Sequence, residues 1–246
     1  MSISQKNPKI ILLTGASSGI GAATARWLAD EGHQLVVGAR RLERLQSLAT
    51  EIRASGGKVD IHALDVTQQA SVEAFAYAAL SRYGRIDVMI NNAGIMPLSP
   101  MAALHVSEWD QMIDVNIRGV LYGIAAVLPT MTQSGRGHII NVSSIGGLAV
   151  VPTASVYCAT KYAVRAISDG LRQENDALRV TCVYPGVVES ELANSITDET
   201  AARAMEEYRK IALKPEAIAA AIAYAVGQPD GVDVNDIVVR PTASMG

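Results

Sequence analysis

The strongest constraint on this chain's fold is the alternation of short apolar runs with longer segments of helical periodicity. The first apolar run covers 10–13, and a helical pattern follows from about 20 to 31. The same pairing recurs to the end of the chain. We expect further strands at 34–37, 59–63, 87–90, 138–142, 179–184 and 236–239, and helices at 42–54, 70–83, 107–132, 154–176 and 215–226.

The strands are apolar nearly throughout rather than strictly alternating with polar residues. That pattern is typical of a parallel sheet covered by helices on both faces. Strands that alternate with helices imply right-handed crossover connections. The sequence therefore predicts an α/β fold, a doubly wound seven-stranded parallel sheet, in one domain over 1–246. Ligands of such sheets bind at the carboxyl ends of the strands, where the strand order reverses.

Composition excludes several classes of protein. The chain has 21 basic and 24 acidic residues, a net charge of −3, whereas proteins that neutralise nucleic-acid phosphates carry a basic excess. Two cysteines, Cys158 and Cys182, cannot build a disulfide framework or a four-cysteine zinc site, and the four histidines show no metal-ligand spacing. The polar start at 1–9 lacks the apolar core of a secretory signal, and the apolar stretches are broken before the roughly 18 residues of a membrane span. We therefore expect a cytoplasmic protein without a metal, nucleic-acid or membrane partner.

A glycine-rich turn joins the first strand to the first helix. Residues 14–21 read Thr-Gly-Ala-Ser-Ser-Gly-Ile-Gly. Gly15 permits a tight turn, Gly19 lets a pyrophosphate approach the backbone, and Gly21 lets helix and strand pack closely. The helix start offers N–H groups to the phosphates. The pattern favours a dinucleotide site, although Gly-x3-Gly-x-Gly differs from the commonest fingerprint and an ordinary strand–helix turn remains an alternative.

The end of the second strand indicates which dinucleotide would bind. An acidic residue there would hold the ribose 2′-hydroxyl of NAD(H), but the chain carries Arg40 and Arg41. Guanidinium groups suit a 2′-phosphate, which a carboxylate would repel. This favours NADP(H) over NAD(H). The alternative is that both arginines are solvated residues at a helix start.

Three further residues suggest catalysis. Tyr157 and Lys161 lie four positions apart in a predicted helix and so share one face, and Ser144 follows the fifth strand. A tyrosine near a lysine is common on helix surfaces, so the pair alone is not diagnostic. Together with the other motifs, however, the chain resembles the short-chain dehydrogenase/reductase family over its whole length, in a compact branch with a Rossmann-like fold. The motifs that carry the resemblance are Thr14-Gly15-x3-Gly19-x-Gly21, Asp65, Asn91-Asn92-Ala93-Gly94, Asn116, Ser144, Tyr157-x3-Lys161 and Pro185-Gly186.

The resemblance implies a role for each catalytic residue. Tyr157 would be the general acid in reduction and the general base in oxidation, with its pKa lowered by Lys161. Ser144 would hydrogen-bond the substrate oxygen, where negative charge develops. Lys161 would also hold the nicotinamide ribose. Asn116 would hold a water that links Lys161 to solvent.

The resemblance also implies a set of cofactor contacts. Asp65 and Val66 would meet the adenine, and Pro185 and Gly186 the nicotinamide carboxamide. Ser190 stands where the family often has threonine. In the NADP-preferring branch a basic residue is common inside the glycine turn, where this chain has serines. The full expected set is Gly15, Ser17, Ser18, Gly19, Ile20, Gly21, Arg40, Arg41, Asp65, Val66, Asn92, Ala93, Gly94, Tyr157, Lys161, Pro185, Gly186, Val188 and Ser190.

The function that the resemblance implies is an NADP(H)-dependent oxidoreductase acting on a small carbonyl or alcohol, similar to bacterial clavulanate-type and hydroxy-acid dehydrogenases. It also implies a homotetramer, or a homodimer, built through the helices near 107–134 and 154–176. One alternative is a catalytically silent NADP(H)-binding regulatory or structural protein, which would usually lose the tyrosine or lysine. Another is a non-redox lyase, which would usually replace the glycine turn.

The segment 187–213 is expected to be a substrate lid, because it is weakly periodic and follows the nicotinamide segment; a surface helix pair is the alternative. Cys158 should point away from Tyr157, and Ser143 is a weaker candidate than Ser144. Arg209, Lys210 and Arg240 could hold a substrate carboxylate. The expected pocket is mostly apolar, which favours a ketone, aldehyde or secondary alcohol, and its members are Met96, Val150, Val151, Pro152 and Tyr184.

Overall fold

A computed structural model of the chain describes residues 8–244, so most of the polar start and the last two residues lie outside the description. Seven strands form one parallel sheet in the order β3-β2-β1-β4-β5-β6-β7. The order reverses between β1 and β4, as the sequence predicts for a doubly wound sheet. The strands are β1 (Ile10–Thr14), β2 (Gln34–Ala39), β3 (Lys58–Ala63), β4 (Val88–Asn91), β5 (His138–Val142), β6 (Arg179–Pro185) and β7 (Asp236–Val239).

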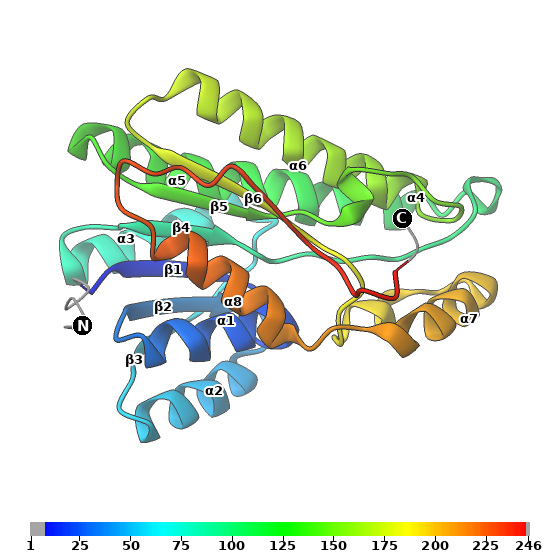
Figure 1. Ribbon diagram of the computed structural model, residues 1–246, viewed down its shortest axis with the longest axis horizontal. Coiled ribbons are helices and arrows are strands. Elements are labelled where there is room, and N and C mark those ends of the chain that lie inside the picture. The colour runs from blue at the N-terminus through cyan, green and yellow to red at the C-terminus, as the bar shows by residue number, and fades with distance from the viewer. Residues whose placement is uncertain (1–7, 245–246) are drawn as a thin grey trace.

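Helices cover both faces of the sheet (Figure 1). Each helix and strand expected from the sequence is present with its ends within two residues of the expected position. The α-helices are α1 (Gly19–Asp30), α2 (Leu42–Ala54), α3 (Gln69–Tyr83), α4 (Val106–Ile113), α5 (Gly119–Ser134), α6 (Ser155–Glu174), α7 (Glu199–Tyr208) and α8 (Pro215–Val226). Short 3-10 turns lie at η1 (Met101–Ala103), η3 (Ile145–Gly147), η4 (Leu192–Ser195) and η5 (Arg209–Ile211).

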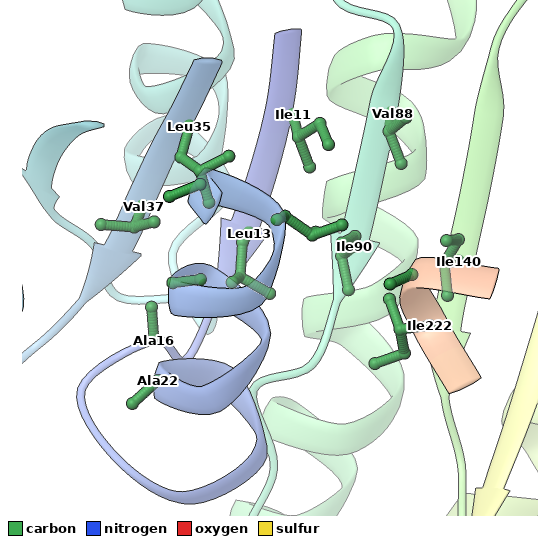
Figure 2. Close-up of a cluster of buried hydrophobic side chains, with 14 of the residues drawn as sticks. Ile11, Leu13, Ala16, Ala22, Leu35, Val37, Val88, Ile90, Ile140 and Ile222 are labelled. Atoms are coloured by element: carbon green, nitrogen blue, oxygen red, sulfur yellow. The ribbon is translucent and has the colours of Figure 1, made fainter. Parts of the chain in front are cut away.

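The apolar strands supply two cores, one on each face of the sheet. In β1, Ile11 and Leu13 enter the core beneath α1, α2 and α8, whereas Ile10 and Leu12 enter the core beneath α3, α5 and α6. Figure 2 shows Leu13 of β1 and Ile222 of α8 in the first of these cores. Because successive side chains of a strand point to opposite faces, a sheet covered on both sides needs apolar residues at every position.

The predicted helix at 107–132 is a continuous helical segment, Val106–Ser134, in which α4 passes into α5 through a π-helical turn, η2 (Asp114–Arg118). Among the described residues it is the one helix long and apolar enough to cross a membrane. Val120, Val127 and Met131 of this segment pack into the core beneath the sheet. A helix that covers one face of a parallel sheet can have the same length and apolar composition as a membrane-spanning helix.

The segment 187–213 is more regular than its sequence suggests. It contains α7, whose start is capped by Asp198, since its Oδ1 accepts a hydrogen bond of 2.8 Å from the Ala201 N–H. Ala201 and Met205 pack against Leu98 and Tyr157 in a small apolar cluster at the carboxyl end of the sheet. This helix corresponds in part to the surface-helix alternative. That the segment moves as a lid stays a prediction.

Candidate active site

The glycine turn between β1 and α1 packs too tightly for side chains. Gly15 has φ +69°, and its N–H donates to Gly38 O at 2.8 Å. A Cβ on Gly21 would lie 2.3 Å from Gly15 O, far inside van der Waals contact. The Ser18 side chain forms no hydrogen bond to the start of α1. The first N–H groups of this helix therefore remain available to an anion.

The ends of β1 and β4 are tied together beside this turn. The Asn92 side-chain amide donates to Thr14 O at 2.9 Å and to Gly15 O at 3.2 Å. Thr14 Oγ1 accepts from the N–H groups of Asn92 and Ala93 at 3.0 and 3.1 Å. These bonds fix the two strand ends that flank the point where the strand order reverses.

Arg41 reaches across to the glycine turn. Its Nη2 donates to Ser18 Oγ at 2.9 Å and to Ser17 Oγ at 3.1 Å. Its Nη1 forms an ion pair with Glu191 at 2.6 Å, and Arg44 Nη1 binds the other oxygen of that carboxylate at 2.5 Å. The two guanidinium groups hold the pKa of Glu191 below its ordinary value. The Arg41 guanidinium thus supplies a positive charge beside Ser17 and Ser18, although the glycine turn itself contains no basic residue.

Arg40 differs from its neighbour. It is exposed, and within the described residues its guanidinium forms no hydrogen bond or ion pair. Both arginines line the same cleft. The geometry therefore makes Arg41, rather than Arg40, the organised member of the pair.

Ser144 and Tyr157 meet at the base of the cleft. Tyr157 is buried, and burial raises its pKa to about 12, while the neighbouring Ser144 hydroxyl acts in the opposite direction. Ser144 Oγ also accepts from Gly146 N at 3.0 Å. The expected lowering of the Tyr157 pKa by Lys161 is absent from the protein alone, because desolvation of the phenolate is the largest effect.

Lys161 lies over the Tyr157 ring, with Nζ 5.8 Å from the ring centroid. The ammonium donates to Val142 O at 3.1 Å. Burial lowers its pKa from 10.5 to about 8, because few polar groups replace the water that it loses. Lys161 is therefore a poorly solvated cation beside the hydroxyl that is the candidate proton donor.

Asn116 is buried in the π-helical turn η2. Its Nδ2 donates to Ile95 O at 3.0 Å and to Thr160 Oγ1 at 3.1 Å, and its Oδ1 accepts from Ile95 N at 2.9 Å. Thr160 Oγ1 in turn donates to Tyr157 O. These bonds tie the segment after β4 to α6, the helix that carries Tyr157. The water expected at Asn116 stays a prediction.

The structure also places Ser143 and Cys158, the sequence neighbours of Ser144 and Tyr157. Ser143 Oγ donates to Lys161 O at 2.9 Å and is buried, so Ser144 is the serine beside Tyr157. Cys158 follows Tyr157 directly in α6 and is buried. A Cβ on Gly146 would lie 3.3 Å from both Cys158 Sγ and Tyr157 Cε1. Both side chains therefore approach Gly146, and Cys158 helps to line the cleft.

One cleft of about 1260 Å³ brings these groups together. It is lined by Ser144 and by all the residues expected to contact the cofactor, from Gly15 to Ser190. Of the expected pocket residues, Met96, Val151 and Pro152 line it, and so do the arginines Arg209 and Arg240. Val150 and Lys210 do not.

Tyr184 was expected in the pocket, and this is wrong. It is 1% exposed in the core beneath α6, and its hydroxyl donates to Asp236 Oδ1 at 3.0 Å. Its position in β6 directs the side chain to a face of the sheet rather than to the strand end. Burial and the Asp236 carboxylate both raise its pKa.

Sequence reasoning missed Arg44 and Glu191, which belong to the charged end of the cleft. Arg44 could have been found, because it follows Arg41 by one turn of α2 and so lies on the same helix face. Glu191 lies 150 residues from Arg41, and no local pattern relates them. The apolar wall formed by Leu98, Ala201 and Met205 also escaped notice, because α7 was not expected.

The chain is similar to known proteins along nearly its whole length. Residues 9–201 match the family profile described as short chain dehydrogenase. An uncharacterized oxidoreductase of Staphylococcus saprophyticus is 47% identical over 239 residues, which cover 96% of each chain. This match covers 96% of the chain, so the similarity continues past residue 201, where the profile match ends.

Solved structures show the same fold. An alcohol dehydrogenase from the archaeon Thermococcus sibiricus, complexed with 5-hydroxy-NADP, has a TM-score of 0.89 and 32% identity over 98% of this chain and 99% of that one. A serine dehydrogenase complexed with NADP+ has a TM-score of 0.87 and 33% identity, with 96% and 98% covered. A Burkholderia phymatum protein of the same kind, complexed with NAD, has a TM-score of 0.87 and 25% identity, with 96% and 90% covered. Proteins of this fold thus bind either dinucleotide.

Proposed function

The chain belongs to the short-chain dehydrogenase family of oxidoreductases, and we propose that it transfers hydride between NADP(H) and a small carbonyl or alcohol substrate. The observation that carries the proposal is one cleft that holds Ser144, Tyr157 and Lys161 at one end and Arg41 with two serines at the other. The first set can move a proton and the second can hold a phosphate. An oxidoreductase of this kind needs both.

The residues of the cleft fit a dinucleotide phosphate. A Cβ on Gly19 would lie 3.2 Å from Ser190 Cβ, so this glycine keeps the space over the start of α1 open. The uncapped helix start suits the pyrophosphate, and Arg41 with Ser17 and Ser18 suits a 2′-phosphate. Lys161 would hold the nicotinamide ribose. The cofactor, when bound, supplies or accepts the hydride.

The candidate catalytic residues act on the proton. With a pKa near 12, Tyr157 is protonated at neutral pH and can donate from its hydroxyl to the oxygen of a carbonyl undergoing reduction. The Ser144 hydroxyl, which lies next to Tyr157 in the same cleft, would donate to the same oxygen as negative charge develops. In the cofactor complex, Lys161, whose Nζ lies 5.8 Å from the Tyr157 ring centroid, would favour the phenolate that remains. In oxidation the same phenolate would accept the proton of an alcohol.

The apolar wall limits the substrate. Met96, Leu98, Val151 and Met205 line the cleft, which favours a small ketone, aldehyde or secondary alcohol. Arg209 and Arg240 line it as well, which leaves room for a substrate with a carboxylate. A catalytically silent protein would have no use for the paired hydroxyls of Ser144 and Tyr157.

The proposal is tested by NADPH and NADH oxidation, followed at 340 nm, against a panel of ketones, aldehydes and keto acids. We expect turnover with NADPH and a preferred carbonyl compound within the panel. Activity with NADH alone would contradict the cofactor proposal. Binding of NADPH without turnover of any compound in a broad panel would favour the silent alternative.

The cofactor preference leads to a first prediction. Arg41→Ala should raise the Kd for NADPH about 10- to 100-fold, because charge-assisted hydrogen bonds contribute about 1.5–3 kcal/mol each. The Kd for NADH should change less than about threefold, and the measurement is titration of both cofactors by calorimetry. Arg26→Ala, which breaks an exposed ion pair with Glu51 outside the cleft, is the matched control. Equal effects on both cofactors would move the 2′-phosphate site elsewhere.

We also propose that the chain assembles as a homotetramer, or a homodimer, in the cytoplasm. Exposed apolar side chains on α4, α5 and α6 support an assembly: Val106, Ile113, Leu121 and Tyr162 are each 38–52% exposed. Burying them against another copy would remove apolar surface from water. Light scattering that gives the mass of a single chain would contradict the assembly.

A further inference from the structure

We propose that Glu191 is a selectivity residue of the cofactor site, which competes with the cofactor's 2′-phosphate for Arg41 and Arg44. The inference rests on the proposed function, since it needs a 2′-phosphate that binds at Arg41. Glu191 comes from the segment after β6, whereas both arginines come from the start of α2. No sequence motif joins the two regions.

The carboxylate of Glu191 binds the two guanidinium groups that a 2′-phosphate would bind. Its Oε2 accepts from Arg41 Nη1 at 2.6 Å and its Oε1 from Arg44 Nη1 at 2.5 Å. One oxyanion shared by two guanidinium groups is an arrangement that a phosphate monoester also forms, with three oxygens and more charge. Glu191 therefore holds the donors that a 2′-phosphate would use.

The other polar groups around Arg41 do not oppose a phosphate. Ser17 and Ser18 carry hydroxyls, which accept from Arg41 here and can turn to donate to an anion. Within the described residues, Asp65 and Glu191 are the two carboxylates that line the cleft, and the side chain of Asp65 bonds to Thr67. Glu191 is thus the group that a bound 2′-phosphate would repel most directly. NAD(H), which has a hydroxyl in its place, would meet no such repulsion.

Glu191 is held near the arginines by its backbone but can turn its side chain away. The preceding Ser190 lies against Gly19 of the glycine turn, and its carbonyl accepts from Arg209 Nη2 at 2.8 Å. Leu192 N donates to Ser190 Oγ, which begins the turn η4. The side chains of Glu191 and Arg41 are 39% and 40% exposed, so the carboxylate can move into water at small cost. Displacement by the cofactor needs no rearrangement of the sheet.

The arrangement makes a quantitative prediction. Glu191→Gln keeps the size of the side chain but removes its charge. We expect the Kd for NADPH to fall about three- to tenfold, the size expected for two half-exposed ion pairs. The Kd for NADH should stay within about twofold. Adenosine 2′,5′-bisphosphate and AMP differ only in the 2′-phosphate, as NADPH and NADH do. The Kd for the bisphosphate should therefore fall in Glu191→Gln, and the Kd for AMP should stay within about twofold.

The chain offers a matched control two residues earlier. Glu189 is 48% exposed and pairs with Lys214 at 2.6 Å, on the same segment but away from the arginines. Glu189→Gln should change neither Kd. In an Arg44→Ala background the effect of Glu191→Gln should become smaller, because one of its two partners is gone. Raising the salt concentration should also reduce it.

The failure of this inference is distinct from the failure of the proposed function. If the protein prefers NADPH and loses that preference in Arg41→Ala, but Glu191→Gln binds NADPH unchanged or more weakly, Glu191 does not compete and the inference is wrong. If the unmodified protein binds adenosine 2′,5′-bisphosphate no more tightly than AMP, the 2′-phosphate site itself is absent and both fall.

Discussion

Tyr157→Phe should reduce turnover about 10²- to 10⁴-fold while the Kd for NADPH stays within about threefold. The variant removes one hydroxyl and leaves the ring that packs against Leu98 and Ala201. A positioned general acid contributes about 10²–10⁴-fold to a rate, and Tyr157 is the proposed proton donor of the cleft. Steady-state kinetics and cofactor titration measure the two quantities separately.

Tyr77→Phe is the control for this variant, since Tyr77 is 72% exposed on α3 and far from the cleft. It should change neither turnover nor cofactor binding. Retention of more than about a tenth of the turnover by Tyr157→Phe would refute its role as general acid. Loss of NADPH binding in parallel with turnover would show that the hydroxyl serves binding instead.

Lys161→Met should abolish turnover and make the protein more stable. Burial lowers the pKa of Lys161 from 10.5 to about 8, so at pH 7 the folded protein holds a charge that the surroundings disfavour. A difference of this size corresponds to about 3 kcal/mol. Methionine removes that cost but loses the hydrogen bond to Val142 O, worth about 1 kcal/mol. We expect a net gain of about 1–3 kcal/mol, or roughly 2–8 °C in Tm.

The pH dependence of stability gives a second check on the same residue. Between pH 8 and 10.5 the unfolded chain binds the Lys161 proton and the folded chain releases it, so stability should rise with pH across this window. Below pH 8 both states hold the proton and this contribution is constant. The rise should be absent in Lys161→Met. Lys210→Met, an exposed lysine paired with Glu207, should change neither Tm nor turnover.

A lower Tm for Lys161→Met would show that the lysine stabilises the fold and is not strained by burial. Substantial turnover in the variant would remove Lys161 from the mechanism. The two outcomes are independent, because one is measured without cofactor and the other with it. The combination expected here, a gain in stability with a loss of activity, is typical of active-site residues that burial disfavours.

Much of the fold follows from patterns that the sequence displays locally. Apolar strands, helical periodicity and stop signals such as Gly32 place each element of the sheet and its main helices. Since the turn at 14–21 and the ends of β2, β4 and β5 lie at the same edge of a parallel sheet, their residues converge on one cleft. The positions of the expected cofactor contacts are a consequence of that topology.

The remaining features depend on tertiary contacts. Tyr184 could not be assigned from sequence, because β6 is apolar on both sides and nothing marks which residues point toward the ligand end. The helix α7 is short and acidic, and the packing of Ala201 and Met205 against Leu98 stabilises it. The pairing of Arg44 with Glu191 joins residues 147 positions apart. Contacts of that range are decided by the folded chain as a whole.

The segment that follows β6 comes back alongside its own start just before α8. Val188 pairs with Leu213, Leu213 N donates to Val187 O at 3.0 Å, and Glu189 N donates to Leu213 O at 2.9 Å. These bonds hold the two ends of the loop together. The entropy of closing a loop grows only slowly with the number of residues in it, so a longer or shorter loop between these ends should change stability little. We expect changes in the length of this segment to leave the sheet intact, while changes at Ser190, Glu191 or the packing positions of α7 would alter the cleft. The length of the segment 189–213, which lines one side of the cleft, can therefore vary independently of the sheet.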